Sequence, residues 1–387
     1  MKKKRILIFA IDYFPYVGGA EIAVREICRR LTNLEFVMIA ARNSRKIPKE
    51  EFIDNVRVIR VGLGWRSLDK YIMTFPAFLT ALKLYRENNF QIVWGLMANT
   101  ASLAALCLKC WHSQVTYLLT LQEGESLDYY WQRTWFWRPL YKAIFRRADF
   151  IQAISNYLAG WARDFGYRGE IFLVPNGVPV KSFGQSQPKE EIERLRKNLG
   201  IAAEEKVVIT TSRLARKNGI EYLIRGFALF KNRTRLPAKL LVVGEGELIG
   251  DLKKIATELG LVKDVLFLGF VEYNRLPLYL QLADVFVRPS LTEGLGNSFL
   301  EAMACGLPVV GTPVGGIVDF LENGRTGIFC KPADADSVSK AIEIILNDDN
   351  LRDNLIKNGK ALINEKYDWD IIAGQMLCLF NKFSEKS

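Results

Sequence analysis

A glycine-rich segment from Arg288 to Val310 (RPSLTEGLGNSFLEAMACGLPVV) carries residues that are suited to binding an anion or a sugar. An apolar run leads into a loop, and a short helix that ends at Gly306 is expected to follow. Gly294 and Gly296 allow backbone amides to approach a ligand closely. The helix N-terminus beyond them adds N–H groups and the positive end of the helix dipole. The segment therefore predicts a site for a phosphate group or for sugar hydroxyls.

Two glutamates accompany these glycines. Glu293 lies in the loop and Glu301 lies one turn into the expected helix, so both can face one ligand. A carboxylate accepts a pair of hydrogen bonds from a vicinal diol, such as that of a ribose or a hexose. A second interpretation stays open for Glu301, because Ser298 and Glu301 have the spacing of a capping box. Glu293 has no such structural explanation.

The two glutamates, separated by seven residues within PSLTEGLGNSFLEAMACGLPVVGTPVGG, resemble the nucleotide-sugar site of the retaining glycosyltransferases of family 4 (glycosyl transferases group 1). That family has the GT-B fold. Five further segments extend the resemblance over most of the chain: GGAE at 18–21, ISNYL at 154–158, PNGV at 175–178, SRL with a basic residue at 212–217, and GEGEL at 244–248. Each segment is weak evidence alone, but the set is specific.

The resemblance implies a role for each donor-site residue. Glu293 is expected to hold donor-sugar hydroxyls and Glu301 the ribose diol. Gly244 and Glu245 are expected to line the base end of the nucleotide. The backbone amides expected to meet the sugar and the phosphates are those of Gly294, Leu295, Gly296, Asn297 and Ser298.

The resemblance also implies a cationic site for the diphosphate. Arg213 is expected to bind it with a neighbouring lysine, since cations stabilise the charge that grows on the leaving group. In the family pattern a lysine directly precedes the glycine, whereas here Asn218 precedes Gly219 and the lysine is Lys217. Lys217 is the expected partner, with Arg216 as the alternative. The family usually works without a catalytic metal, and the sequence shows no Asp-x-Asp of the kind that metal-dependent transferases carry, so neither a metal site nor a bound cofactor is expected.

In the first half, Gly18, Gly19 and Glu21 are expected to open a helix and face a phosphate or sugar, although a plain strand-to-helix turn is the alternative. Gln122 stands where many relatives have a histidine, and glutamine cannot act as a general base. In retaining enzymes of this family the leaving phosphate is proposed to take the acceptor proton itself. Glu123 or Glu125 is then a binder or an auxiliary base.

Short apolar runs alternate with helical patterns and must position these residues. This alternation predicts two doubly wound α/β domains with parallel sheets. Ligands of such sheets bind at the carboxyl ends of the strands, so the active site is expected in the cleft between the domains. The expected strands are Ile6–Ile11, Phe36–Ala40, Val56–Val61, Ile92–Trp94, Val115–Leu119, Phe150–Ala153, Ile171–Val174, Val207–Thr211, Lys239–Val243, Val265–Leu268, Val285–Val287, Val309–Val310 and Gly327–Phe329.

Four segments follow from this pattern. Residues 1–180 are the expected acceptor-binding domain, and residues 206–368 the nucleotide-sugar-binding domain. Residues 181–205 are the expected linker and hinge, with a short helix at Lys189–Asn198. A final helix in 369–387 is expected to pack on either domain.

Composition excludes several classes of protein. The chain has 387 residues, of which 49% are hydrophobic and 25% charged, as in a folded globular protein. Its single histidine, His112, leaves almost no material for histidine-rich zinc sites or for nucleophile–histidine catalysis. Six scattered cysteines, including a lone Cys107-x-x-Cys110, indicate a reducing compartment rather than a disulfide scaffold.

Positive charge is concentrated in the first half. Residues 1–180 contain 25 Lys and Arg and 15 Asp and Glu, so this half carries a net charge of +10 (25 − 15) of the chain's +11. Such a field favours an anionic partner, although a merely solubilising surface is the alternative. Aromatic and basic residues interleave at 131–147, which suits a membrane interface. Stacking on nucleic acid and a core helix with solvated cations are the other interpretations, and no nucleic-acid motif accompanies the segment.

No transmembrane helix or signal peptide is expected, because the apolar run after the basic N-terminus is only six residues long. The expected location is cytoplasmic, with peripheral contact to the inner face of a membrane as an option.

The function predicted from the sequence is retaining, metal-independent transfer of a hexose in polysaccharide synthesis. The donor is expected to be UDP- or GDP-linked rather than ADP-linked, and the acceptor a glycan or a lipid-linked sugar. A nucleotide-sugar epimerase or hydrolase with the same fold, and a catalytically silent binding protein, are the alternatives. The sequence does not predict the oligomeric state.

Overall fold

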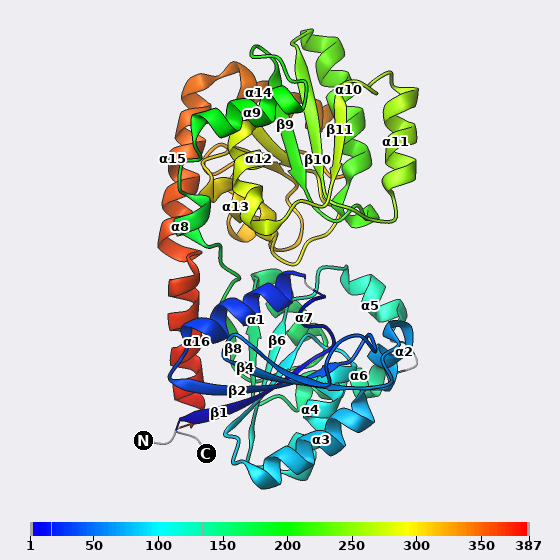
Figure 1. Ribbon diagram of the computed structural model, residues 1–387, viewed down its shortest axis with the longest axis vertical. Helices are drawn as coiled ribbons and strands as arrows, with labels where there is room; N and C mark the ends of the chain where they lie inside the picture. The colour runs from blue at the N-terminus through cyan, green and yellow to red at the C-terminus, as the bar shows by residue number, and fades with distance from the viewer. Residues whose placement is uncertain (1–2, 17, 134, 136, 385–387) are drawn as a thin grey trace. The chain divides into compact units, whose positions relative to one another are not determined.

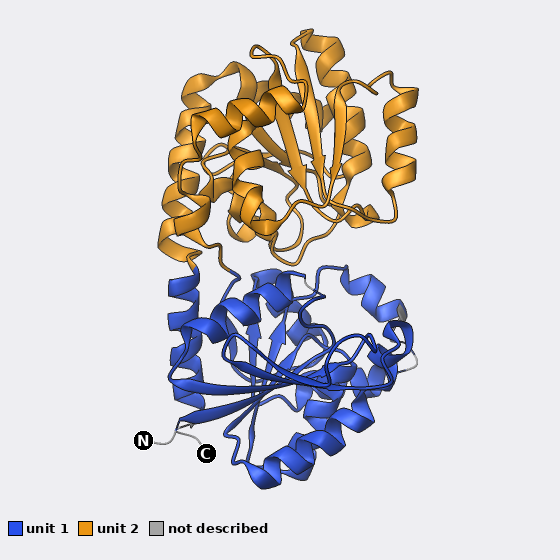
Figure 2. Ribbon diagram, viewed as in Figure 1, with its two compact units in different colours: residues 1–176, 369–387 blue, residues 177–368 orange. Residues whose placement is uncertain are grey.

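The computed structural model describes residues 3–16, 18–133, 135 and 137–384 (Figure 1). It divides into two compact units, shown in Figure 2. Unit 1 comprises residues 1–176 and 369–387, and unit 2 comprises residues 177–368. The chain therefore passes between the units after Asn176 and again after Asp368. Residues 181–205 lie within unit 2.

Unit 1 is built on an eight-stranded sheet with the order β3-β4-β2-β1-β5-β6-β7-β8. Its neighbouring strands are parallel except for the β3–β4 pair. The strands are β1 (Lys4–Ala10), β2 (Leu34–Ala41), β3 (Glu50–Ile53), β4 (Val56–Val61), β5 (Ile92–Leu96), β6 (Thr116–Leu121), β7 (Phe150–Ala153) and β8 (Ile171–Leu173).

Helices cover both faces of this sheet. They are α1 (Gly19–Arg30), α2 (Arg66–Ile72), α3 (Thr74–Glu87), α4 (Thr100–Trp111), α5 (Leu127–Arg133), α6 (Arg138–Arg146), α7 (Asn156–Asp164) and α16 (Trp369–Ser384). Successive side chains of β1 point to opposite faces of the sheet. Ile6 and Ile8 join the apolar cluster that α1 and α16 line, whereas Leu7 and Phe9 lie on the opposite face. Helix α4 packs on β1 and is flanked by α3 and α6.

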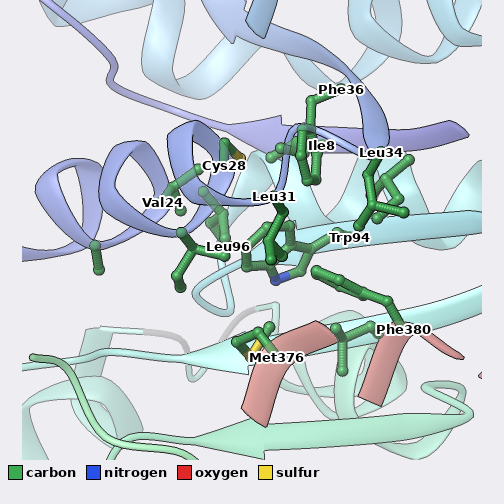
Figure 3. Close-up of a cluster of buried hydrophobic side chains, with 14 of the residues drawn as sticks. Ile8, Val24, Cys28, Leu31, Leu34, Phe36, Trp94, Leu96, Met376 and Phe380 are labelled. Atoms are coloured by element: carbon green, nitrogen blue, oxygen red, sulfur yellow. The ribbon is translucent and has the colours of Figure 1, made fainter. Parts of the chain in front are cut away.

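The cluster beneath α1 and α16 is the core of unit 1 (Figure 3). Trp94 of β5 is fully buried and meets Phe380 of α16 edge to face at 5.3 Å between ring centroids. Met376, one turn earlier on α16, is buried in the same cluster. Burying such large side chains stabilises the fold by about 1.5–3 kcal/mol each. The final helix therefore belongs to unit 1.

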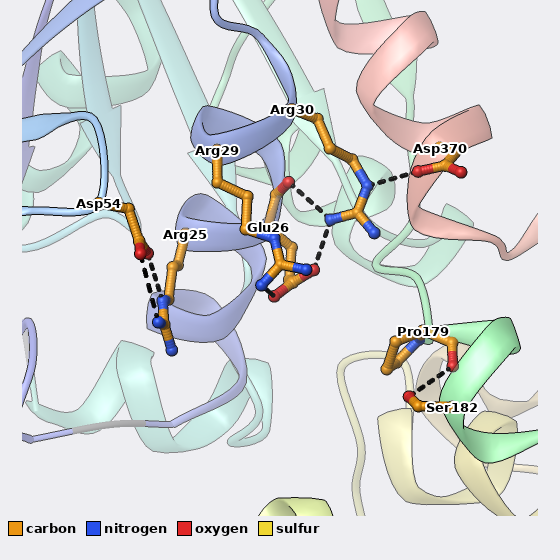
Figure 4. Close-up of polar contacts among 8 residues, drawn as sticks. All are labelled: Arg25, Glu26, Arg29, Arg30, Asp54, Pro179, Ser182 and Asp370. Atoms are coloured by element: carbon orange, nitrogen blue, oxygen red, sulfur yellow. Dashed lines mark hydrogen bonds and ion pairs between the residues drawn. The ribbon is translucent and has the colours of Figure 1, made fainter.

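Ion pairs reinforce the packing of α16 on α1 (Figure 4). Arg30 donates from Nε to Asp370 Oδ1 at 2.6 Å and from Nη1 to Glu26 Oε2 at 2.5 Å. The Arg30 and Glu26 side chains are 19% and 12% exposed, so their ion pair is less screened than a surface pair, whereas the Asp370 side chain is 59% exposed. The N-terminus of α16 is thus fixed to unit 1 directly after the second passage between the units.

Unit 2 is built on a six-stranded parallel sheet with the order β11-β10-β9-β12-β13-β14. The strands are β9 (Lys206–Thr211), β10 (Ala238–Val243), β11 (Val265–Gly269), β12 (Val285–Arg288), β13 (Val309–Gly311) and β14 (Ile328–Phe329). The helices are α8 (Val180–Phe183), α9 (Lys189–Asn198), η1 (Arg216–Asn218), α10 (Ile220–Thr234), α11 (Ile249–Glu258), η2 (Tyr273–Arg275), α12 (Leu276–Leu282), α13 (Asn297–Ala304), η3 (Gly315–Asp319), α14 (Ala335–Asn347) and α15 (Asp349–Lys366).

All thirteen expected strands are present, and the predicted fold class is confirmed. The sequence analysis missed β3, an antiparallel edge strand that begins with two glutamates and buries little apolar surface. The short helix expected at Lys189–Asn198 is α9. Among the described residues, no helix combines the length and the apolar character needed to cross a bilayer. His112 stacks on Tyr85 at 4.2 Å, as a packed surface residue does.

Candidate active site

The loop after β12 in unit 2 is organised by a buried arginine. Arg288, the last residue of β12, donates from Nη2 to Glu293 Oε2 and from Nη1 to Ser298 Oγ, both at 2.5 Å. The Arg288 side chain is 7% exposed and that of Glu293 is 15% exposed. The Glu293 carboxylate also accepts from the N–H of Gly294 at 3.2 Å. One guanidinium therefore fixes both a loop carboxylate and a helix hydroxyl at the carboxyl end of a parallel strand.

The helix that follows this loop begins without a side-chain cap. Its N-cap is Gly296, whose φ of +105° is in the region that favours glycine. Ser298 is consequently in the first turn, and its hydroxyl accepts from Arg288 instead of capping the helix. The capping-box interpretation of Ser298 and Glu301 is therefore wrong. The first-turn amides of α13 and the positive end of its dipole can serve an anion.

Glu301 is held differently from Glu293. Burial raises the pKa of the Glu301 carboxyl to about 7, and a hydrogen bond from Tyr273 and the charge of Arg288 oppose this rise. Tyr273 belongs to η2, which follows β11. A desolvated carboxylate next to a phenol hydroxyl is suited to accepting hydrogen bonds from a ligand diol.

The basic segment after β9 is attached to the Glu293 loop. Asn218 is 4% exposed and donates to the backbone oxygen of Arg213 at 2.6 Å. A Cβ on Gly219 would lie 1.9 Å from the backbone oxygen of Pro289, so only glycine allows this approach. The N–H of Leu291 donates to the oxygen of Lys217 at 2.6 Å. Asn218, which stands where the family pattern has a lysine, therefore supports the backbone of the basic segment. Lys217 is the lysine that lies beside the loop after β12.

The GEGEL turn after β10 is shaped by close backbone approach. A Cβ on Gly244 would lie 1.9 Å from the oxygen of Ser212, and one on Gly246 would lie 2.4 Å from the oxygen of Leu214. The oxygen of Glu245 accepts from the N–H of Leu214 at 2.8 Å, and its side chain is exposed. These glycines therefore fix the turn against the segment that carries Arg213.

Polar atoms without partners gather at the same ends of β9 and β12. Among the described residues, Thr210 Oγ1, Thr211 Oγ1, Ser212 Oγ and Ser290 Oγ are buried and have no hydrogen-bond partner. Buried hydroxyls normally find a partner, so unpaired ones mark a place where water or a ligand binds. These atoms lie in the segments next to Arg213 and Arg288.

The position of Glu293 depends on Gly315, which gives a testable prediction. Gly315 and Gly324 both have a positive φ, of +56° and +75°. A Cβ on Gly315 would lie 1.8 Å from the backbone oxygen of Glu293, whereas a Cβ on Gly324 would meet nothing within 4 Å. We expect Gly315→Ala to lose at least about 2 kcal/mol more unfolding free energy than Gly324→Ala. Denaturant unfolding of both variants measures the difference. Equal losses would show that the Glu293 loop can shift at little cost.

In unit 1, Gly18, Gly19 and Glu21 form the start of α1. Glu21 Oε2 accepts from the N–H of Gly18 at 2.7 Å, and burial raises the pKa of the Glu21 carboxyl. The side chain therefore closes the first turn of its own helix. The structure brings these three residues together at the end of the β1 loop, where Glu21 has a structural contact of its own.

Gln122 and Glu123 follow β6 and contact two different segments. Gln122 Oε1 accepts from Asn176 Nδ2 at 3.0 Å. Glu123 is 1% exposed, and its Oε1 accepts from the N–H of Ala98 at 2.7 Å. Its Oε2 is buried without a partner among the described residues. Burial raises the pKa of Glu123 to about 7, so the protonated and ionised forms are both populated near neutral pH.

The raised pKa of Glu123 predicts a pH-dependent stability. Between pH 4.5 and 7 the folded protein retains a proton that the unfolded chain releases, so stability falls as the pH rises through this range. Between pH 4.5 and 7 the unfolding free energy of the wild type should fall by about 3 kcal/mol relative to that of Glu123→Gln. Above pH 7 the difference should stay constant. The contribution of Glu301 to the pH dependence is the same in both proteins and therefore cancels in the difference. Unfolding curves at several pH values test this, and parallel pH profiles would contradict it.

No role was assigned from the sequence to three residues near the strand ends. For Arg288 the only available signal was a charge at the carboxyl end of a buried strand, and no local pattern pointed to Tyr273. Asp12, just after β1, accepts from Asn43 Nδ2 at 2.7 Å, and burial raises the pKa of its carboxyl against the charges of Arg66 and Lys70. Arg288 is at the carboxyl end of a parallel strand, and Tyr273 and Asp12 lie just beyond such ends, where these sheets bind ligands.

Comparison with known proteins identifies the class. The family model described as Glycosyltransferase Family 4 matches residues 17–182, and that described as Glycosyl transferases group 1 matches residues 191–362. A GDP-mannose-dependent alpha-(1-6)-phosphatidylinositol monomannoside mannosyltransferase from Mycolicibacterium smegmatis is 31% identical over 361 residues, 89% of either chain. A GDP-mannose-dependent monoacylated alpha-(1-6)-phosphatidylinositol monomannoside mannosyltransferase from Corynebacterium glutamicum is 27% identical over 96% of this chain and 97% of that one. The structure of sucrose-phosphate synthase from Thermosynechococcus elongatus matches with a TM-score of 0.84 and 25% identity over 100% of both chains.

The chain therefore belongs to the family 4 glycosyltransferases, which have the GT-B fold. It is an enzyme that transfers a sugar from a nucleotide-sugar donor to a glycan or lipid acceptor. The predictions of family, fold and reaction class made from the sequence are confirmed.

Proposed function

We propose that this enzyme transfers a hexose from a GDP- or UDP-linked donor with retention at the anomeric carbon and without a metal ion. The observation that carries the proposal is the cluster in which Arg288 holds Glu293 and Ser298 next to the basic segment of Arg213 and Lys217. The mannosyltransferases similar to this chain use GDP-mannose, which makes it the first donor to test.

In this proposal, unit 2 binds the donor. Glu293 accepts hydrogen bonds from donor-sugar hydroxyls, because Arg288 fixes its orientation before the ligand arrives. Glu301 accepts from the ribose diol. The amides from Gly294 to Ser298 meet the sugar and the phosphates at the uncapped start of α13. Gly244 and Glu245 lie at the base end of the nucleotide.

Arg213 and Lys217 act on the leaving group. Breaking the bond between the anomeric carbon and the phosphate oxygen leaves a nucleoside diphosphate whose negative charge grows in the transition state. Two cations beside the diphosphate stabilise that charge, which is the work a divalent ion does in metal-dependent transferases. The Gly219–Pro289 approach holds this basic segment against the Glu293 loop.

Retention follows if the acceptor attacks on the face that the diphosphate leaves. The acceptor oxygen forms its bond to the anomeric carbon, the phosphate oxygen departs, and that oxygen takes the acceptor proton. Gln122 cannot accept that proton, and it is engaged with Asn176. Gly18, Gly19 and Glu21 line the acceptor end of unit 1 in this account, and Glu123, which is 1% exposed, holds the loop after β6 through its hydrogen bond from Ala98.

One reaction tests all three parts of the proposal. The enzyme is incubated with GDP-mannose, UDP-glucose or ADP-glucose and octyl α-mannoside, with or without EDTA, and the anomeric configuration of the product is read by NMR. We expect an α-linked product from a GDP- or UDP-linked α-donor, at an unchanged rate in EDTA. A β-linked product would contradict retention, and a rate lost in EDTA and restored by a divalent ion would contradict metal independence.

A further inference from the structure

The outer face of α2 and α3 in unit 1 carries a stripe of large apolar side chains. They recur every three or four residues, which is the spacing of one helix face. Trp65 is 54% exposed, Tyr71 is 55% exposed and Phe75 is 68% exposed. The members of this apolar stripe are Trp65, Leu68, Tyr71, Ile72, Phe75 and Leu79.

The inner face of the same two helices already supplies the core contacts. Met73, Ala77, Ala81 and Leu84 are buried. Thr74 Oγ1 donates to the oxygen of Thr100 at 2.9 Å, and this bond attaches the start of α3 to α4. The pair is anchored through its inner face, and the stripe is only partly covered: Leu68 and Ile72 are 36% and 38% exposed, whereas the rings of Tyr71 and Phe75 are more than half exposed. An apolar outer face on such a helix pair marks an interaction surface.

A buried carboxylate fixes the loop at one end of the stripe. Asp69 is fully buried and accepts from the N–H groups of Leu63, Gly64 and Trp65 at 2.7 to 3.0 Å. Leu63 and Trp65 are each more than half exposed. The exposure of these side chains is therefore built into the loop by three hydrogen bonds.

The exposed charges of this helix pair are mainly positive. The basic residues of segment 65–87 are Arg66, Lys70, Lys83 and Arg86; of its two acidic residues, Asp69 is buried, and Glu87 is exposed at the end of α3. Arg45 lies over the Trp65 ring at 5.5 Å, and Lys70 Nζ lies over the Tyr71 ring at 5.0 Å. Cations beside interfacial aromatic rings suit a surface of negatively charged headgroups.

The segment 131–147, which the sequence analysis linked to a membrane interface, has a mixed role. Trp131 stacks on Phe165 at 4.7 Å, and Tyr141, Ile144 and Phe145 are buried, so much of it is core. Trp137 and Leu140 are exposed. Thr134 and Phe136 lie outside the described residues.

We propose that the outer face of α2 and α3 binds the surface of a lipid bilayer that contains anionic lipids. The aromatic rings would lie at headgroup depth, the aliphatic side chains would reach the acyl chains, and Arg66, Lys70, Lys83 and Arg86 would meet lipid phosphates. Charge complementarity selects this occupant, because an exposed apolar stripe flanked by four basic residues, with the single exposed carboxylate of Glu87 at the far end of α3, matches an anionic surface. The proposal does not depend on the donor or on the reaction.

Vesicle co-sedimentation tests the proposal on the full chain without substrate. Vesicles of phosphatidylcholine alone are compared with vesicles that also contain phosphatidylglycerol, at low and high salt. We expect binding to the anionic vesicles that weakens in salt. The double variant Phe75→Ser/Leu79→Ser should lower the partition coefficient at least about 10-fold. Lys83→Glu/Arg86→Glu should abolish the preference for anionic vesicles.

The matched control is Val262→Ser/Phe270→Ser in unit 2, whose side chains are 62% and 72% exposed. It should bind vesicles as the wild type does, and thermal melts should show that every variant is folded. Absence of wild-type binding, or equal binding by Phe75→Ser/Leu79→Ser, would overturn the proposal. A wild-type dimer that this variant dissolves, with no vesicle binding, would overturn it in favour of a second copy of the chain.

Discussion

Glu293→Gln lowers kcat/KM for sugar transfer by a factor of about 100 to 1,000. The carboxylate is oriented by Arg288 and lies at the start of the α13 loop, so its negative charge is available to donor-sugar hydroxyls as positive charge develops on the sugar ring. Glutamine keeps the size of the side chain but removes that charge. Initial rates over a range of donor concentrations measure the loss, which should fall mainly on kcat.

The fold of this variant needs its own measurement. Removing the carboxylate leaves the Arg288 guanidinium, 7% exposed, without its counter-ion, at a cost of about 1–3 kcal/mol. A melting temperature a few degrees lower is thus expected, with the protein still folded at the assay temperature. Glu322→Gln removes an exposed ion pair of the same unit and should change neither quantity. Wild-type kcat in folded Glu293→Gln would remove Glu293 from the catalytic site.

Arg213→Ala and Lys217→Ala each lower kcat by about 100-fold, because each removes a cation from the leaving diphosphate. Arg216→Ala is the matched control, since Arg216 is an exposed cation next to Lys217 on the same short helix. It should change kcat by less than about three-fold, as an ordinary surface substitution does. The comparison also decides between the two basic residues that the shifted family pattern leaves as candidates.

A donor with a better leaving group separates this role from a structural one. The losses in Arg213→Ala and Lys217→Ala should shrink with such a donor, because less charge stabilisation is needed there. Nucleoside diphosphate affinity should fall in the same two variants. A large loss in Arg216→Ala with a small one in Lys217→Ala would assign the phosphate contact to Arg216 instead.

The sheets of both units could be predicted because many of their strands are nearly continuous apolar runs, such as Ile6–Ile11, and alternate with helical patterns, as is typical of a parallel sheet covered on both faces. Strand β3 lacked that signal, since its exposed residues Glu50 and Phe52 alternate with the half-buried Glu51 and Ile53. The position of the last helix was also open, because an apolar face does not say which partner it meets. Trp94 and Phe380 settle it through a contact between residues nearly 300 positions apart.

The candidate site was predicted where the chemistry is local and missed where it depends on distant contacts. Glycines and carboxylates in one loop indicate a sugar-phosphate site by themselves. The capping spacing of Ser298 and Glu301 gave a wrong alternative, because Arg288 takes the serine hydroxyl and a glycine begins the helix. Tyr273 reaches Glu301 from another strand end, which no local pattern reveals.

The most direct test of the account is a thermal-melt panel of the full chain with UDP, GDP, ADP, CMP and NAD. A ligand at about 100 times its Kd adds about 2.7 kcal/mol of stability, which raises Tm by about 5 °C or more in a unit of this size. The account predicts such a shift with GDP or UDP, and its loss in the double variant Arg213→Ala/Lys217→Ala. A shift with NAD alone, or none with any nucleoside diphosphate, would contradict the assignment of unit 2 as the nucleotide-sugar site.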